Sequence, residues 1–132
     1  MRYLLDTNTC IAAMRNQPKV LQRMAAISPT DCAVSSIVIY ELYTGVEKSV
    51  NPVKERVKVD TLMQTFQELP FDMTAAMEAA WVRAQLESQG QPIGPYDTLL
   101  AGQALSLALV LVSANVKEFS RVPGFTVENW QA

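Results

Sequence analysis

Short apolar runs alternate with longer stretches of helical periodicity along the whole chain, and this alternation is the feature that most constrains its fold. The runs predict strands at residues 3–5, 32–35 and 109–113, and near 69 and 125–127. Helices are predicted at residues 8–16, 18–27, 36–49, 52–66, 74–89 and 95–108. Strands that are separated by helices pair in parallel, so the order predicts an α/β fold with a mainly parallel sheet of short strands.

The length of the chain predicts one domain, residues 1–132, with a single core, because 132 residues are enough to bury most of the unfolded surface. The first apolar run is too short for a signal peptide. No stretch approaches the ~20 apolar residues of a membrane span. We therefore expect a cytoplasmic protein without a membrane segment.

The chain contains no histidine, which excludes the usual zinc sites and every mechanism built on an imidazole. Its two cysteines, Cys10 and Cys32, have no CxxC spacing, so we expect two reduced, buried thiols. A formal net charge of −2 argues against a broad polyanion-binding surface. Chemistry must therefore depend on carboxylates, hydroxyls, amines or a bound metal.

A charged residue, Asp6, ends the first predicted strand in the segment RYLLDTNTC. Ligands bind at the carboxyl ends of the strands of an α/β sheet, and Asp6 lies at such an end. Asp6 or Thr7 could instead cap the following helix, although Asn8 and Thr9 are also good caps. A functional carboxylate and a helix cap are both open at this position.

Glu41 lies on a predicted helix among apolar or small neighbours one turn away, Ile37, Val38, Thr44 and Gly45. A carboxylate buried without a partner costs several kcal/mol or becomes protonated, so Glu41 needs a cation, donors or water at a cleft. The alternative is that the predicted apolar face is wrong and that Glu41 lies on the exposed surface of the helix.

Two further acids follow in the second half of the chain. Asp97 continues an apolar helix face, although an acid in a first helical turn is favoured by the helix dipole in any case. Glu118 has the spacing of a capping box with Asn115 as N-cap. The strand before it nevertheless delivers Ser113, Asn115 and Glu118 to the same sheet edge as Asp6.

Four carboxylates at one edge would repel one another, and a divalent cation would relieve this repulsion. Mg²⁺, with Mn²⁺ as a possible substitute, fits best because these hard ions accept a few carboxylates together with water and phosphate. The predicted metal ligands are Asp6, Glu41, Asp97 and Glu118.

Three segments together closely resemble the PIN-domain ribonucleases, specifically the VapC-type toxins of type II toxin–antitoxin systems. They are LLDTN, YELYTGVEKS and GQPIGPYDTLLAGQALSLALVLVSANVKEFSRVPGFTVENW, and the resemblance covers essentially the whole chain. It implies a three-layer α/β/α sandwich with a mainly parallel central sheet.

The resemblance also implies the chemistry. Asp6, Glu41 and Asp97 match the metal-binding carboxylates of the family, and Glu118 matches its fourth acid. The implied reaction is hydrolysis of an RNA phosphodiester bond by a metal-activated water. The residues implied to support the four catalytic acids are Thr7, Asn8, Ser113 and Asn115.

The partners come from the resemblance alone: an RNA substrate with tRNA suspected, a second copy of the chain in a homodimer, and a cognate antitoxin that inhibits the enzyme. Relatives commonly carry an amide where this chain has Ala114. A weakly active or inactive PIN-fold module that binds a protein partner is the alternative reading. Tyr40 and Tyr96, each next to an acid, could stack on a base or simply pack.

Overall fold

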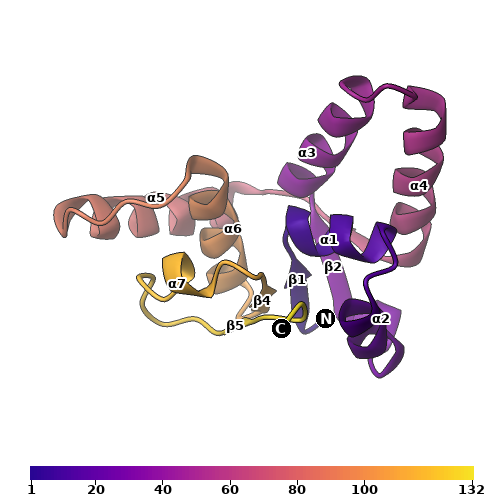
Figure 1. The fold of residues 1–132 in the computed structure, drawn as a ribbon. Coiled ribbons are helices and arrows are strands. Elements are labelled where there is room, and N and C mark those ends of the chain that lie inside the picture. The colour runs from indigo at the N-terminus through magenta and orange to yellow at the C-terminus, as the bar shows by residue number, and fades with distance from the viewer.

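The computed structural model describes residues 1–132 and contains a five-stranded, all-parallel sheet with helices on both faces (Figure 1). The strand order is β3-β2-β1-β4-β5. The strands are β1 (Tyr3–Leu5), β2 (Cys32–Ser35), β3 (Gln67–Leu69), β4 (Val110–Val112) and β5 (Val127–Glu128). The predicted α/β class and parallel pairing are confirmed.

Seven α-helices connect and cover the strands, and they agree with the predicted helices to within a few residues. They are α1 (Thr7–Met14), α2 (Pro18–Ala25), α3 (Ser36–Glu47), α4 (Pro52–Thr65), α5 (Met73–Ser88), α6 (Pro95–Ser106) and α7 (Val116–Phe119). The helix α7 was not predicted as an element, and β5 begins at Val127 rather than at residue 125. No helix is long and apolar enough to cross a membrane.

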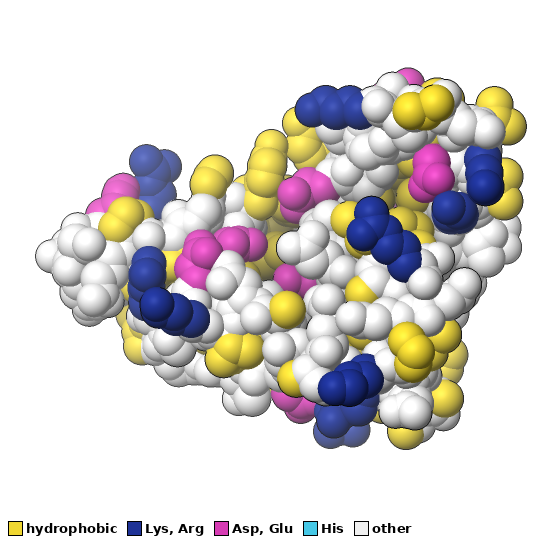
Figure 2. Space-filling view, in the orientation of Figure 1, with side chains coloured by type: hydrophobic (Ala, Val, Ile, Leu, Met, Phe, Trp, Pro, Cys, Tyr) yellow, Lys and Arg dark blue, Asp and Glu magenta, His cyan; other side chains and the backbone are white.

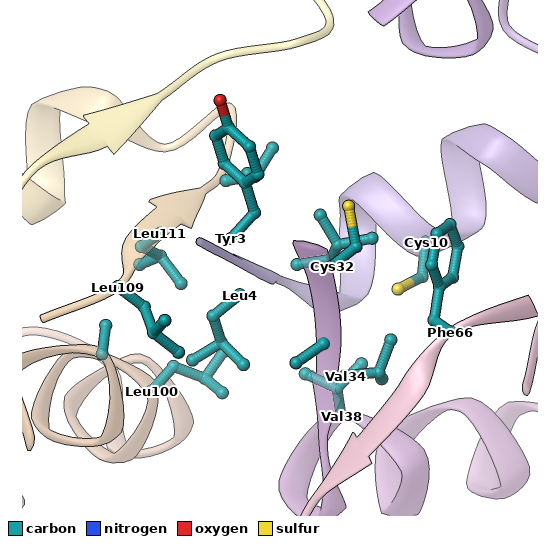
Figure 3. Packing of buried hydrophobic residues seen from close by; sticks show 14 of the residues in the cluster. Tyr3, Leu4, Cys10, Cys32, Val34, Val38, Phe66, Leu100, Leu109 and Leu111 are labelled. Atoms are coloured by element: carbon teal, nitrogen blue, oxygen red, sulfur yellow. The ribbon is translucent and has the colours of Figure 1, made fainter. Parts of the chain in front are cut away.

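The two faces of the sheet are covered by different helices. Side chains alternate between the faces along a strand, so Tyr3 and Leu4 of β1 point in opposite directions. Leu4 extends toward Leu100 of α6, whereas Cys32 of β2 lies on the side where Cys10 of α1 packs (Figure 3). The arrangement is the three-layer α/β/α sandwich implied by the resemblance.

Both cysteines are buried and free, as predicted. Burial raises the pKa of the Cys10 thiol far above its ordinary value, and burial raises that of Cys32 to about 11. Neither thiol is ionised near neutral pH, so both serve as small apolar core residues.

The helices α5 and α6 pack closely because Gly102 has no side chain. A Cβ atom at Gly102 would lie 2.3 Å from the Ala79 backbone, a distance that no packed structure tolerates. This contact fixes α6, the helix that carries Asp97, against α5.

Candidate active site

Asp6 joins the central strand β1 to α1, and it is almost completely buried. Its Oδ1 accepts a 2.8 Å hydrogen bond from the Thr9 backbone N–H and so caps α1. The Asp6 backbone N–H donates to the carbonyl of Val112 at the end of β4. Asp6 is thus a helix cap and also a carboxylate at the sheet edge. The cap uses Oδ1 only, so Oδ2 can still serve a functional role.

Glu41 reaches the same edge from α3, where it is half-buried. Thr7 Oγ1 donates a 2.8 Å hydrogen bond to Glu41 Oε1, so the residue that follows Asp6 orients the second acid. Ser35 at the end of β2 caps α3 by accepting from the Ile37 N–H. The end of each of two neighbouring strands therefore positions one carboxylate.

Asp97 lies in the first turn of α6, three residues after Gly94. The pKa of Asp97 is raised to about 6, mainly by burial; the negative charges of Glu118 and Asp6, a hydrogen bond with Glu118 and the charge of Glu41 contribute in the same direction. The charges of all three other predicted acids therefore act on the pKa of Asp97.

Glu118 lies on α7 and has a different hydrogen-bond pattern from the predicted capping box. Asn115 is the N-cap, but its side chain makes no capping bond to the backbone. Instead Glu118 Oε1 accepts from the Gly94 N–H at 2.7 Å, and Glu118 Oε2 accepts from Asn115 Nδ2. The capping-box prediction was wrong because Glu118 accepts from the Gly94 N–H, while the Asn115 N–H donates to Ser113 Oγ.

These donors stabilise the ionised form of Glu118. The Gly94 hydrogen bond lowers the pKa of Glu118, and the amide of Asn115 lowers it further, against a smaller opposing effect of burial. The neighbouring acids therefore differ: Glu118 is held as a carboxylate, whereas Asp97 accepts a proton near pH 6. Gly94 links these two acids, because its N–H donates to Glu118 and it caps α6, the helix that carries Asp97.

The predicted supporting residues behave differently from one another. Ser113 is fully buried, and its Oγ accepts from the Asn115 N–H at 3.0 Å. Asn115 donates its side-chain amide to Glu118, and Ala114 before it is exposed. Asn8 is exposed on α1.

The four acids come from four segments of the chain, which are the β1–α1 junction, α3, α6 and α7. Figure 2 shows acidic side chains around a hollow in the surface, between the part of the molecule formed by α5, α6 and α7 and the part formed by α1 and α3. No three of the acidic side chains converge tightly enough to enclose a cation by themselves. Mg²⁺ commonly needs only one or two direct carboxylates because it retains water. The donor set therefore fits a hydrated divalent ion.

Two residues of the site were missed by sequence reasoning. Thr9 is buried, and its Oγ1 donates to the Val112 carbonyl at 3.1 Å, which ties the start of α1 to β4. Gly94 donates its N–H to Glu118. A threonine after a strand-end acid and a glycine before a helix proline are common features, and neither carries a signal for a contact across the fold.

Comparison with known proteins agrees with this architecture. The PIN domain family model matches residues 3–124, and the chain belongs to the PIN-domain family. Within that family it belongs to the VapC branch. It is 37% identical over 130 residues to the tRNA(fMet)-specific endonuclease VapC of Salmonella typhimurium, and the match covers 98% of each chain.

Solved structures of VapC chains have the same fold. The crystal structure of DNA-bound VapBC from Salmonella typhimurium contains a chain with a TM-score of 0.93 and 37% identity, covering 98% of both chains. VapBC2 from Rickettsia felis, bound to a DNA fragment from its promoter, matches with a TM-score of 0.92 and 32% identity, covering 98% of this chain and 99% of that chain.

Proposed function

We propose that this protein is an endoribonuclease that hydrolyses RNA phosphodiester bonds and uses Mg²⁺ or Mn²⁺. The observation that carries the proposal is that four carboxylates lie near one sheet edge, close enough for the charges of Glu118, Asp6 and Glu41 to raise the pKa of Asp97. The name of the Salmonella relative, a tRNA(fMet)-specific endonuclease, supports RNA as the substrate class and tRNA as the first candidate.

The metal ligands in this proposal are Asp6, Glu41, Asp97 and Glu118. A bound divalent ion would supply Lewis-acid activation of water and stabilise negative charge on the scissile phosphate. The acids themselves hold the negative charge that attracts the ion and place it at the hollow. The ion would also offset the repulsion that burial and three neighbouring carboxylates impose on Asp97.

The supporting residues orient the acids. Thr7 holds Glu41 through its hydroxyl, and Gly94 and Asn115 hold Glu118 as a carboxylate. Ser113 stabilises the turn that carries Asn115. Because outer hydrogen bonds fix the orientation of metal ligands, loss of one such bond typically costs roughly 10-fold to 100-fold in activity.

We further propose that a cognate antitoxin inhibits the enzyme and that the active form is a homodimer. The Salmonella and Rickettsia relatives were both solved as VapBC assemblies, which supports the antitoxin. A groove between α1, α3 and α4 begins at Glu41 and is lined in part by Ile11, Met14 and Leu42. A segment of a partner in this groove would lie directly beside the acids.

The test is cleavage of total RNA and of a tRNA set by antitoxin-free protein, with Mg²⁺, with Mn²⁺ and with excess chelator. Asp6→Asn is the matched variant because it removes one charge and retains an oxygen that can cap α1. Discrete fragments that require the metal and are absent with Asp6→Asn are expected. Equal patterns from both proteins would reject the nuclease and favour the alternative, a binding module without activity.

A further inference from the structure

Two tyrosines stand beside the acids and take little part in the core. Tyr40 precedes Glu41 on α3, and Tyr96 precedes Asp97 on α6. Their side chains are 57% and 41% exposed. Large aromatic side chains are usually buried to a greater extent than this, so the exposure of both at one place needs an explanation other than folding.

The two rings lie close together although they come from helices that are far apart in the sequence. Their centroids lie 6.0 Å apart and their planes are tilted by 60°, a geometry near the favourable edge-to-face arrangement. The pair therefore has a defined mutual orientation while most of the Tyr40 ring remains open to solvent.

An open aromatic ring next to a phosphate-binding site matches single-stranded RNA. Bases that are not paired stack on aromatic side chains, and every base offers a flat face for this contact. The chain has a net charge of −2, and the acids of the site repel the phosphates of RNA. Stacking supplies binding energy that does not depend on charge.

We propose that Tyr40 is the platform on which one base of the RNA substrate stacks, and that Tyr96 supports the Tyr40 ring from the side. The inference rests on the proposed nuclease function. It assigns the stacked base to a nucleotide adjoining the bond that is cut, because each tyrosine is the immediate neighbour of an acid of the site. Tyr40 thus contributes to the choice of the cleaved bond.

The experiment compares Tyr40→Leu and Tyr40→Phe on synthetic tRNA(fMet), either intact or with one abasic nucleotide on either side of the mapped cut. Leucine keeps an apolar side chain and is a better helix former than tyrosine, so α3 should fold normally. Trp81→Leu is the matched control, since Trp81 is an exposed aromatic residue on α5, outside the site. Circular dichroism and gel filtration check folding and oligomeric state.

For Tyr40→Leu we expect kcat/KM on intact RNA to fall by roughly 5-fold to 100-fold, the range for loss of one stacked base. Tyr40→Phe and Trp81→Leu should cleave nearly as well as the wild type. An abasic nucleotide at one of the two positions should slow the wild type by a similar factor and should not slow Tyr40→Leu any further. This loss of sensitivity is a signature that a merely structural role would not produce.

Different results separate the two proposals. If the wild type cuts and Asp6→Asn does not, while Tyr40→Leu cuts like the wild type, the stacking role is overturned and the nuclease stands. If Tyr40→Leu changes only the oligomeric state, the tyrosines belong to a protein contact, and the stacking role is again overturned. A wild type that cuts no RNA with either metal overturns both proposals.

Discussion

The substitution Asp97→Asn tests the electrostatic description of the site without any substrate. In the folded protein the pKa of Asp97 is about 6, against an ordinary value of 3.8. Between these pH values the folded state holds a proton that the unfolded state has released, so the free energy of unfolding falls as the pH rises from about 4 to about 6. Above pH 6 the full destabilisation by the ionised carboxylate is present.

The magnitude follows from the pKa values. A difference of about 2 between folded and unfolded states corresponds to about 3 kcal/mol, at about 1.36 kcal/mol per pKa unit. Asp97 is half-exposed, and solvent screening reduces this to about 1.5 kcal/mol. Loss of the favourable interaction between the carboxylate and the start of α6 removes about 0.5 kcal/mol of this gain. Metal-free Asp97→Asn should therefore be about 1 kcal/mol more stable than the wild type at pH 8.

The assay is thermal unfolding in excess chelator at pH 4 and at pH 8. A gain of about 1 kcal/mol raises Tm by roughly 3 to 5 °C in a chain of this length, and we expect this gain only at pH 8. Glu68→Gln is the matched control, because Glu68 is an exposed acid on β3 whose charge does not affect Asp97. The same variant should lose cleavage activity and Mn²⁺ affinity by calorimetry.

Two results would refute the reasoning. A Tm that drops by several degrees in the metal-free variant at pH 8 would mean that Asp97 holds the fold together rather than straining it. A gain of equal size at pH 4 and pH 8 would mean that the effect does not arise from ionisation.

Three further predictions concern other parts of the structure. Thr7→Val removes the hydrogen bond to Glu41 and should lower kcat by about 10-fold, whereas Thr7→Ser should retain activity; equal losses in both would exclude the hydroxyl as the cause. Gly102→Ala should lower the free energy of unfolding, measured by chemical denaturation, by at least about 2 kcal/mol, because the new methyl group would overlap Ala79. Gly45→Ala on α3, where the new methyl group meets nothing within 4 Å, should raise it by up to about 1 kcal/mol. Similar values for the two variants would contradict the packing argument. Both buried thiols should resist a thiol-specific reagent at pH 7 in the native protein and react once it is unfolded, and rapid native labelling would show that one of them is accessible.

The order of strands and helices could be predicted because apolar runs and helical periodicity are local properties of the chain. The apolar surroundings of Glu41 identified it as an unusual carboxylate for the same reason. The hydrogen bond from Gly94 to Glu118 could not be predicted, since it joins residues 24 positions apart, the N-cap of α6 and a side chain of α7. The local pattern favoured a capping box, and a contact that exists only in the folded protein replaced it.

The pairing of β1 with β4 has a consequence for folding. Tyr3 pairs with Val110, so the central strand acquires its second neighbour only after a loop of more than 100 residues has closed. Such distant pairings slow folding because the entropy of loop closure is lost before the contact is gained. Asp6 and Glu118 come together in this same event. The acid cluster is therefore assembled only when β1 and β4 have paired, and any nuclease activity depends on that pairing.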